Sequence, residues 1–421
     1  MDDGIHGAGL DGGLDGMVFE DDVLLAEPPT LSDLEAAGSL SGHYALEGVS
    51  DGAPWFARDP LGVHKLFIAR VDGTYLADRQ LLRLLERATD HDAVWSVPPG
   101  HVLRAEPGPE SRFTVVRRDL PSAPELERVD DPIAPIRTLF RTTLDQLAPR
   151  LSGPTFVTLS GGLDSSAIAA LALEALPDLQ AITFRIGEGR VHADEDLACA
   201  RLVAKTLGLP LQEVVVTEEE VRARLDEVLV SGQDHRDFNV HCALVNACLG
   251  AALPRGATVL TGDGSNELFA DYEPVELEGR VHYPLPRLSR SELRRYLVAG
   301  LDVGDREVGV FRHHGVAVVQ PYLLCADAFA RLPGAWLDDR RAKTTVLRQV
   351  TEGRLPEKIY QRPKVRAQCA RPSGQGGTLS ALADVDDTAL RQRFATLHGV
   401  EERWVKSFFR LGRHRPPPLT A

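Results

Sequence analysis

The stretch Thr158-Leu-Ser-Gly-Gly-Leu-Asp-Ser-Ser166 decides the fold of this chain. Its Ser-Gly-Gly turn follows a short apolar segment, 155–159, which is typical of a buried strand. The turn is followed by an Ala- and Leu-rich segment that is typical of a helix. A strand that ends in a Ser-Gly-Gly turn before a helix presents backbone N–H groups at the positive helix end, which is an anion site. The hydroxyls of Ser160, Ser165 and Ser166 add donors, and Asp164 offers an oxygen ligand to Mg²⁺ that bridges phosphates. The pattern is neither a Walker A loop nor GxGxxG.

Strand-like and helix-like segments alternate outward from this stretch. Strands are expected over 155–159, 180–186, 211–216 and 257–261, and helices over 131–147, 167–176, 194–207, 218–230 and 239–253. This alternation predicts an α/β fold with a doubly wound parallel sheet, followed by a mostly helical C-terminal part. The Pro-rich end, 413–421, is expected to be disordered.

The SGGLDSS pattern resembles the PP-loop of ATP pyrophosphatases, which cleave ATP between the α- and β-phosphates. The resemblance implies ATP and Mg²⁺ as cofactors and a reaction in which an oxygen is adenylated and a nitrogen or sulfur nucleophile then displaces AMP. The implied ATP-binding residues in this loop are Leu159, Ser160, Gly161, Gly162, Asp164, Ser165 and Ser166.

A second stretch, Leu260-Thr-Gly-Asp-Gly-Ser-Asn-Glu-Leu-Phe-Ala-Asp-Tyr272, resembles the second signature of the asparagine synthetase family. The resemblance implies that Gly262 faces the adenine or ribose and that position 266 holds the second Mg²⁺ ligand beside Asp164. Asn266 stands where the family has Asp, so an uncharged amide oxygen replaces a carboxylate. Asp263 or Glu267 could compensate, and both are candidate catalytic residues.

Two further segments resemble the same family. Leu355-Pro-Glu-Lys-Ile-Tyr-Gln-Arg-Pro-Lys364 is similar to its late LPxxIxxRPK element, in which the lysine stabilises charge on the transferring carbonyl or the pyrophosphate. Lys364 is therefore a candidate for both catalysis and ATP binding. The segment 184–208 looks like the strand and helix after the PP-loop, which implies that Phe184 flanks the adenine.

The N-terminal part reads as short strands with turn signals, interrupted by one amphipathic helix near 81–85. The segments 41–47, 57–67 and 97–101 resemble the later strands of the family's glutaminase domain. That domain uses a cysteine at its extreme N-terminus, whereas this chain begins Met-Asp-Asp and its first cysteine is Cys199. We therefore expect a flexible leader (1–16), a truncated glutaminase-like domain (17–125) without glutamine hydrolysis, a synthetase domain (126–412) and the tail (413–421).

The substrate side is expected in the loop 231–242, which crowds acids, amides and histidines before an apolar helix face. Candidate substrate contacts are His235, Arg236, Asp237, Asn239 and His241. The alternative is a solvated helix cap with Asp237 or Asn239 as the N-cap. A second group, 305–315 followed by 320–322, matches the family's pocket-lining region, although His313 and His314 favour a surface position.

Composition restricts the class of protein. Lys and Arg number 47 against 61 Asp and Glu, giving a net charge of −14, which argues against a nucleic-acid-binding surface. The five cysteines fit neither a zinc site nor a disulfide framework, which indicates a reducing compartment. With no signal peptide and no apolar run of about 18 residues, a cytoplasmic protein without membrane contact is expected.

These observations predict an AMP-forming ligase that adenylates a carboxylate and transfers the acyl group to an amine. The two partners would be small molecules or a precursor peptide, and a homo-oligomer or a pathway partner protein stays open. Intramolecular capture would make a lactam, as in β-lactam synthetases or lasso-peptide cyclases, and intermolecular capture an amide in specialised metabolism. The alternative is a catalytically impaired nucleotide-binding relative that regulates or scaffolds a partner, and its support is Asn266.

Overall fold

The computed structural model describes most of the chain, and all structural statements below concern its described residues. These are residues 16–108, 110–119, 133–151, 153–187, 195–269, 275–277, 280–282, 298, 301–326, 329, 340–363, 377–410 and 412–420. The expected leader lies outside this set except for Gly16, which begins a strand, and Lys364 also lies outside it.

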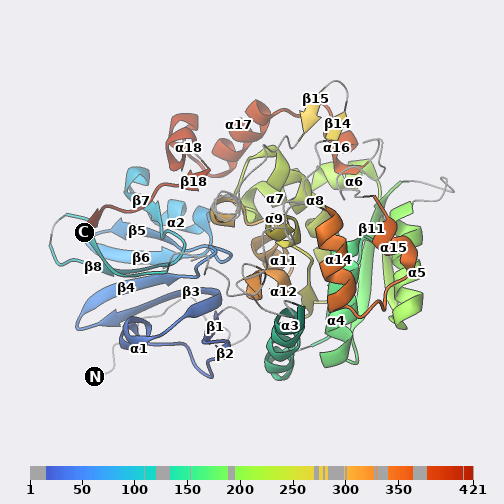
Figure 1. Ribbon diagram of the computed structural model, residues 1–421. Helices are drawn as coiled ribbons and strands as arrows, with labels where there is room; N and C mark the ends of the chain where they lie inside the picture. Colours follow the sequence, from blue (N-terminus) through green and yellow to red (C-terminus); the bar gives the residue numbers. More distant parts are fainter. Residues whose placement is uncertain are drawn as a thin grey trace.

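A five-stranded parallel sheet forms the centre of the larger part of the molecule (Figure 1). Its strands are β10 (Thr155–Thr158), β11 (Gln180–Ile186), β12 (Leu211–Val216), β13 (Thr258–Leu260) and β16 (Ala317–Val319). The spatial order is β12-β11-β10-β13-β16, and every neighbouring pair is parallel. The predicted doubly wound α/β fold is confirmed.

This strand order creates a topological switch point. The chain runs from β10 outward to β11 and β12, and then returns to place β13 on the other side of β10. Ligands of such sheets bind beyond the carboxyl ends of the strands at the point where the order reverses. The Ser-Gly-Gly turn follows β10 and the Thr261–Asn266 stretch follows β13, so the topology alone brings the two predicted motifs together.

Helices connect these strands, cover the sheet or follow it in the C-terminal part. They are α3 (Ile133–Leu147), α4 (Leu163–Ala175), α5 (Glu195–Leu207), α6 (Glu218–Ala223), α7 (Leu225–Ser231), α8 (Asp237–Ala252), α9 (Ser265–Phe269), α11 (Val308–His313), α12 (Pro321–Leu324), α14 (Arg340–Val350), α15 (Glu357–Gln361), α16 (Gly377–Ala381), α17 (Asp387–Leu397) and α18 (Glu402–Phe408), with a small hairpin of β14 (Val275–Leu277) and β15 (Arg280–His282). The single helix expected over 218–230 is wrong. The chain leaves helical geometry at Arg224 (φ −87°, ψ 2°), so two short helices replace it.

The N-terminal part is β-rich, as predicted. Its elements are β1 (Gly16–Glu20), β2 (Val23–Leu24), α1 (Leu31–Ala36), β3 (Leu40–Ser50), β4 (Ala53–Arg58), β5 (Phe67–Val71), β6 (Thr74–Asp78), α2 (Leu81–Arg87), β7 (Val94–Ser96), β8 (His101–Ala105) and β9 (Phe113–Arg118). They form a three-stranded sheet and, together with β19 (Leu419–Thr420), a seven-stranded sheet, and residues of both sheets, including Phe56, Phe113 and Trp95, share one core. Figure 1 shows this part in blue beside the green parallel sheet.

The expectation of a disordered C-terminal tail is wrong. β18 (Arg413–His414) pairs with β17 (Phe409–Arg410), and β19 (Leu419–Thr420) pairs in parallel with β9. The carbonyl of Pro418 accepts a hydrogen bond from the Phe113 N–H at 3.0 Å. Prolines lack an N–H but keep a carbonyl acceptor, and the edge of a sheet tolerates them.

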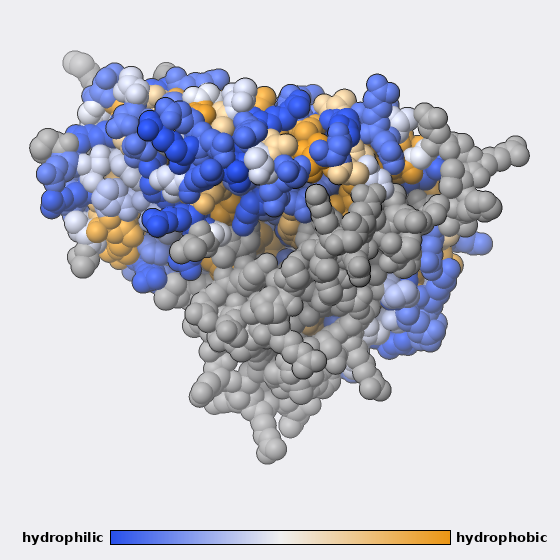
Figure 2. All heavy atoms as spheres, turned by 90° about the horizontal axis from the view of Figure 1, so that it is seen from above, coloured by the Kyte–Doolittle hydropathy of each residue, from blue (hydrophilic) through white to orange (hydrophobic). Residues whose placement is uncertain are grey.

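The described surface seen from above is mostly hydrophilic (Figure 2). Figure 2 shows hydrophilic residues over much of the described part of one face, with apolar residues in small separate groups. Within the described ranges, no helix combines the length and apolar character that crossing a bilayer requires.

Candidate active site

The Ser-Gly-Gly turn packs tightly because of its glycines. Gly161 has φ +70°, and a Cβ atom there would lie 2.6 Å from the Ala200 N and the Cys199 Cβ of α5. This position therefore requires glycine both for its backbone conformation and for the close approach of α5. Gly162 is the N-cap of α4 and makes no capping bond through a side chain. The first amides of α4 are therefore left for a ligand.

Serine hydroxyls hold the turn in place. The Ser165 Oγ accepts a hydrogen bond from the Ser160 N–H at 3.2 Å, and the two hydroxyl oxygens are 3.1 Å apart. The Ser160 Oγ also accepts from the Gly162 N–H at 3.3 Å. Ser166 is fully buried and its Oγ has no hydrogen-bond partner among the described residues. Two of the three predicted hydroxyl donors therefore stand at the turn, whereas Ser166 belongs to the core behind it.

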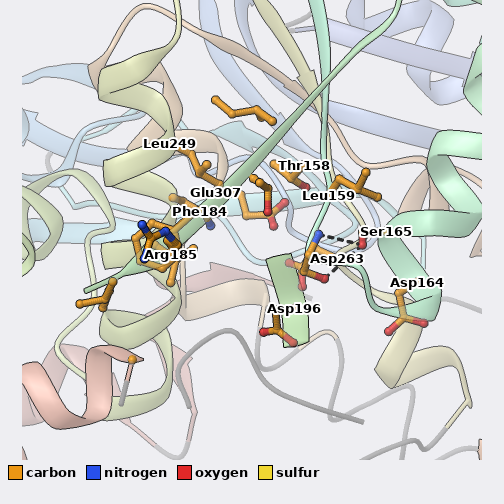
Figure 3. Close-up of a pocket in the computed structure, with 18 residues that line it drawn as sticks. Thr158, Leu159, Asp164, Ser165, Phe184, Arg185, Asp196, Leu249, Asp263 and Glu307 are labelled. Carbon is orange, nitrogen blue, oxygen red and sulfur yellow. Dashed lines mark hydrogen bonds between the residues drawn. The ribbon is translucent and has the colours of Figure 1, made fainter. Parts of the chain in front are cut away.

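A cavity of about 240 Å³ opens at the carboxyl edge of the sheet (Figure 3). Of the residues predicted to bind ATP, it is lined by Leu159, Ser160, Asp164, Ser165, Phe184 and Gly262, and Asp263 also lines it. Gly262 allows the second loop to approach the first, because a Cβ there would lie 3.2 Å from the Ser165 N. In Figure 3, Phe184 and Leu249 lie on one side of the view and Asp164 on the other. Apolar side chains therefore line the side of the cavity opposite Asp164, where the charged side chains of Arg185 and Glu307 also lie.

A cluster of charged groups lies beside the cavity, around Arg306. Its guanidinium donates to Asp263, lies 3.7 Å from Glu267, and donates to the Asn239 Oδ1 at 3.2 Å. The Asp263 Oδ2 and the Glu267 Oε2 are buried and have no hydrogen-bond partner in the described part of the chain. Of the two predicted catalytic carboxylates, Asp263 lines the cavity and Glu267 lies behind it.

Glu307 lines the same cavity and carries a perturbed carboxyl group. Thr261 Oγ1 donates to Glu307 Oε2, as does Gln320 Nε2 at 2.7 Å. Burial, together with the negative charge of Asp263, raises the pKa of Glu307 from 4.5 to about 8. A carboxyl group with such a pKa can exchange a proton near neutral pH.

The two predicted metal ligands are joined by a lysine. The Lys343 Nζ lies 2.6 Å from the Asp164 Oδ1 and donates to the Asn266 Oδ1 at 3.1 Å. The Asp164 and Asn266 oxygens that would bind a shared Mg²⁺ therefore both face the buried Lys343 ammonium. A metal ion bound by these two side chains does not fit this arrangement. Over the described ranges, no group of three His, Cys, Asp or Glu side chains has the arrangement of a metal site.

The late LPEKIYQRPK element reaches the Ser-Gly-Gly turn. Arg362, just after α15, is buried, donates to the Ser160 carbonyl at 3.5 Å and forms an ion pair with Asp196. Asp196 in turn lines the cavity. The element therefore lies at the candidate site, and the role of Lys364 stays a prediction.

The five predicted substrate contacts do not line this cavity. His235 packs between the rings of Phe394 and Phe409, and burial lowers its pKa. Arg236 is the N-cap of α8 and pairs with Asp234 at 2.9 Å.

The other three also bind neighbours within the protein. Asp237 and His241 form an i,i+4 pair at 2.9 Å. Asn239 alone connects to the charged cluster, through Arg306. The role of these five residues in substrate binding stays a prediction.

Comparison with known proteins shows which family the chain is similar to. The asparagine synthase family model matches residues 136–308. The chain is distantly homologous to the asparagine synthetases.

The relatives show how far this homology extends. The glutamine-hydrolyzing asparagine synthetase of Gallus gallus is 28% identical over 415 residues, covering 85% of this chain and 69% of that protein. The Homo sapiens enzyme is 31% identical over 266 residues, and the putative enzyme of Mycobacterium tuberculosis H37Rv is 32% identical over 287 residues. This chain spans less than half the length of the last two, 46% and 42%. Among solved structures, NMN synthetase of Francisella tularensis aligns over 64% of this chain with 14% identity and a TM-score of 0.33.

Several site residues are outside the sequence prediction. Glu307 lies within the second predicted group, 305–315, but nothing singles it out there as the partly buried acid. Arg306 and Arg362 lie in the predicted segments 305–315 and 355–364, but the sequence pattern assigned neither arginine a role of its own. Lys343 lies in a helix with no motif, and its only signal is its spacing from Val346, Leu347 and Val350 on the buried helix face.

Proposed function

We propose that this chain is an ATP-dependent ligase that adenylates a carboxylate, releases pyrophosphate and transfers the acyl group to an amine. The observation that carries the proposal is the meeting of the Ser160–Gly162 turn and the Gly262–Asp263 turn around one cavity at the switch point of the sheet. Distant homology to asparagine synthetases supports the same class of reaction.

The cavity suits ATP in two ways. The free first-turn amides of α4 and the Ser160 and Ser165 hydroxyls offer donors to phosphate oxygens. Phe184, Val245 and Leu249 offer an apolar wall to a purine ring. When bound, ATP supplies the adenylyl group that activates the carboxylate. The protein's part is to hold the phosphates in line and to exclude water from the activated acid.

The charged cluster suits the amine half of the reaction. An attacking amine must lose a proton, and Glu307 is a partly buried carboxyl group in the cavity wall with a pKa of about 8. Thr261 and Gln320 fix its position by hydrogen bonds to the carboxylate. We assign Glu307 as the base, with Asp263 between it and Arg306 as a positioning group.

We further propose that the nitrogen comes from an amine of the substrates and not from glutamine. Cys199 is fully buried in α5 under the Ser-Gly-Gly turn, where its thiol cannot act as a glutaminase nucleophile. The product would be a lactam or an amide in specialised-metabolite or peptide biosynthesis. The resemblance to β-lactam synthetases implies a Tyr/Glu pair that deprotonates the amine, but Asp263 stands at the position of the Tyr, so this chain departs from that pair.

Product analysis tests the proposal. The protein is incubated with [α-³²P]ATP, Mg²⁺ and carboxylate probes: aspartate, glutamate, N-acyl amino acids and short peptides. We expect AMP and pyrophosphate in equal amounts with at least one probe, together with exchange of [³²P]pyrophosphate into ATP. ADP and phosphate from the same site would contradict the proposal.

A matched pair of variants ties the product to the cavity. Gly262→Val places methyl groups against the first turn of α4 and should abolish AMP formation. Ala223→Val adds two methyl carbons on the exposed face of α6 and should change nothing.

A nucleotide-binding scaffold without catalysis is the second candidate, favoured by Asn266. It predicts that ATP binds and that Gly262→Val abolishes the binding, yet no probe yields AMP.

A further inference from the structure

Lys343 is a charged residue on an apolar helix face. It lies on the same face of α14 as Val346, Leu347 and Val350, at spacings of three, four and seven residues, and all four side chains are fully buried. A buried ammonium is unfavourable unless charged and polar groups compensate it. The chain therefore has a specific use for a positive charge at this point.

The compensating groups come from the two nucleotide-site motifs. Asp164, in the first turn of α4, supplies one negative charge at 2.6 Å, and Asn266, in α9, supplies a neutral oxygen at 3.1 Å. The Ser265 Oγ donates to the same Asp164 oxygen at 3.0 Å. Among the described residues, one positive and one negative charge meet here, and Asn266 adds an oxygen without a second negative charge.

The position distinguishes this contact from an ordinary core ion pair. Asp164 lines the cavity, and its side chain keeps 23% of its surface exposed. The Lys343 ammonium therefore contacts a carboxylate, that of Asp164, which itself lines the cavity where the α4 amides would bind phosphates.

We propose that Lys343 takes the place of a metal ion between Asp164 and Asn266, so that this site carries a cation belonging to the chain itself. The assignment of this cation to the phosphate side of the reaction rests on the proposed function. The exclusion of a metal by Lys343 stands on the geometry alone. The only divalent ion expected at this end of the cavity is then the one that enters with the nucleotide.

Manganese binding without nucleotide tests the exclusion. Free Mn²⁺ is measured by electron paramagnetic resonance during titration of wild type, Asn266→Asp, Lys343→Met and the double variant Lys343→Met/Asn266→Asp. We expect no tight Mn²⁺ site in wild type or in Asn266→Asp, because the Lys343 ammonium occupies the place between the two side chains that a metal ion would need. The double variant should gain one site, since two carboxylates then face an apolar side chain.

A tight Mn²⁺ site in wild type, or one created by Asn266→Asp alone, would overturn the inference. Both of these proteins keep Lys343, so the test stays decisive even where Lys343→Met fails to fold by circular dichroism. Arg348→Met is the matched control, because it removes a cation from the exposed side of the same helix, where Arg348 pairs with Glu357.

Titration with α,β-methylene-ATP, which resists cleavage between the α- and β-phosphates, tests the link to the phosphates. Lys343→Met should weaken its binding about tenfold or more, and Arg348→Met less than twofold. Equal affinities in all variants would overturn the phosphate-side role. If the analogue does not bind wild type, the proposed function fails, while the manganese result still decides whether Lys343 excludes a metal.

Discussion

Two arginines, Arg58 and Arg306, show how differently this molecule uses the same side chain. Arg58 joins the β-rich part to the larger part: it donates to the carbonyls of His64 and Val97 and to Asp302, at 2.7, 2.9 and 2.7 Å. Arg306 lies beside the cavity, and its partners Asp263 and Glu267 each keep a buried oxygen without a described partner. A polar cluster whose groups are all bonded holds two parts together, whereas one with unused acceptors is ready for a ligand.

The largest expected effect follows from breaking the cluster around Arg58. Arg58→Ala leaves the Asp302 carboxylate buried without its cation and should lower the free energy of unfolding by about 3–5 kcal/mol. Urea denaturation measures this loss, and ATP affinity of the folded protein should not change. Arg104→Ala, which removes an exposed pair with Asp51, is the control and should cost about 0–1 kcal/mol. Similar losses in both variants would contradict the comparison.

The second effect concerns rate and not stability. Lys364→Ala should reduce turnover about 10²–10³-fold while melting temperature and ATP affinity stay close to those of wild type, because the lysine is expected to stabilise charge only in the transition state. Lys364→Arg should rescue little, since a planar guanidinium does not replace a compact ammonium. Turnover above about a third of wild type in Lys364→Ala, well short of that range, would make this a surface lysine.

The third effect is a pH dependence of the reaction rate that arises from Glu307, beside the cluster around Arg306. Only the deprotonated form of Glu307 can accept a proton, so the rate should rise with pH and level off above about 8. Glu307→Gln should be slower and lack this rise. Folding raises this pKa from 4.5 to about 8. The contribution of Glu307 to stability is therefore fully present below pH 4.5 and is lost as the pH rises through about 8. Melting temperatures at pH 6 and pH 9 should therefore diverge more in wild type than in Glu307→Gln.

The smallest effect concerns a predicted substrate contact that the fold uses for packing. His235→Phe keeps a ring between Phe394 and Phe409 and should change the free energy of unfolding by less than about 1.5 kcal/mol. We expect no change in KM for the carboxylate. A KM raised tenfold with unchanged stability would instead place His235 at the substrate.

The sequence by itself determined the local units of the site. A short apolar strand, a Ser-Gly-Gly turn and an Ala-rich helix are adjacent in the chain, and their conformation depends on neighbouring residues and on the φ of Gly161. The alternation of strands and helices then placed both motifs at the carboxyl edge of one sheet. Leu159, Ser160, Asp164, Phe184 and Gly262 are therefore predictable as cavity residues.

Only the tertiary structure decided which distant charges meet there. Lys343 reaches Asp164 across 179 positions and Asn266 across 77, and β19 returns from the end of the chain to pair with β9. Such contacts depend on how complete helices and sheets pack, which no local pattern encodes. The physical reason is that burial makes an uncompensated charge costly, so the partner of each buried charge is chosen by the three-dimensional arrangement.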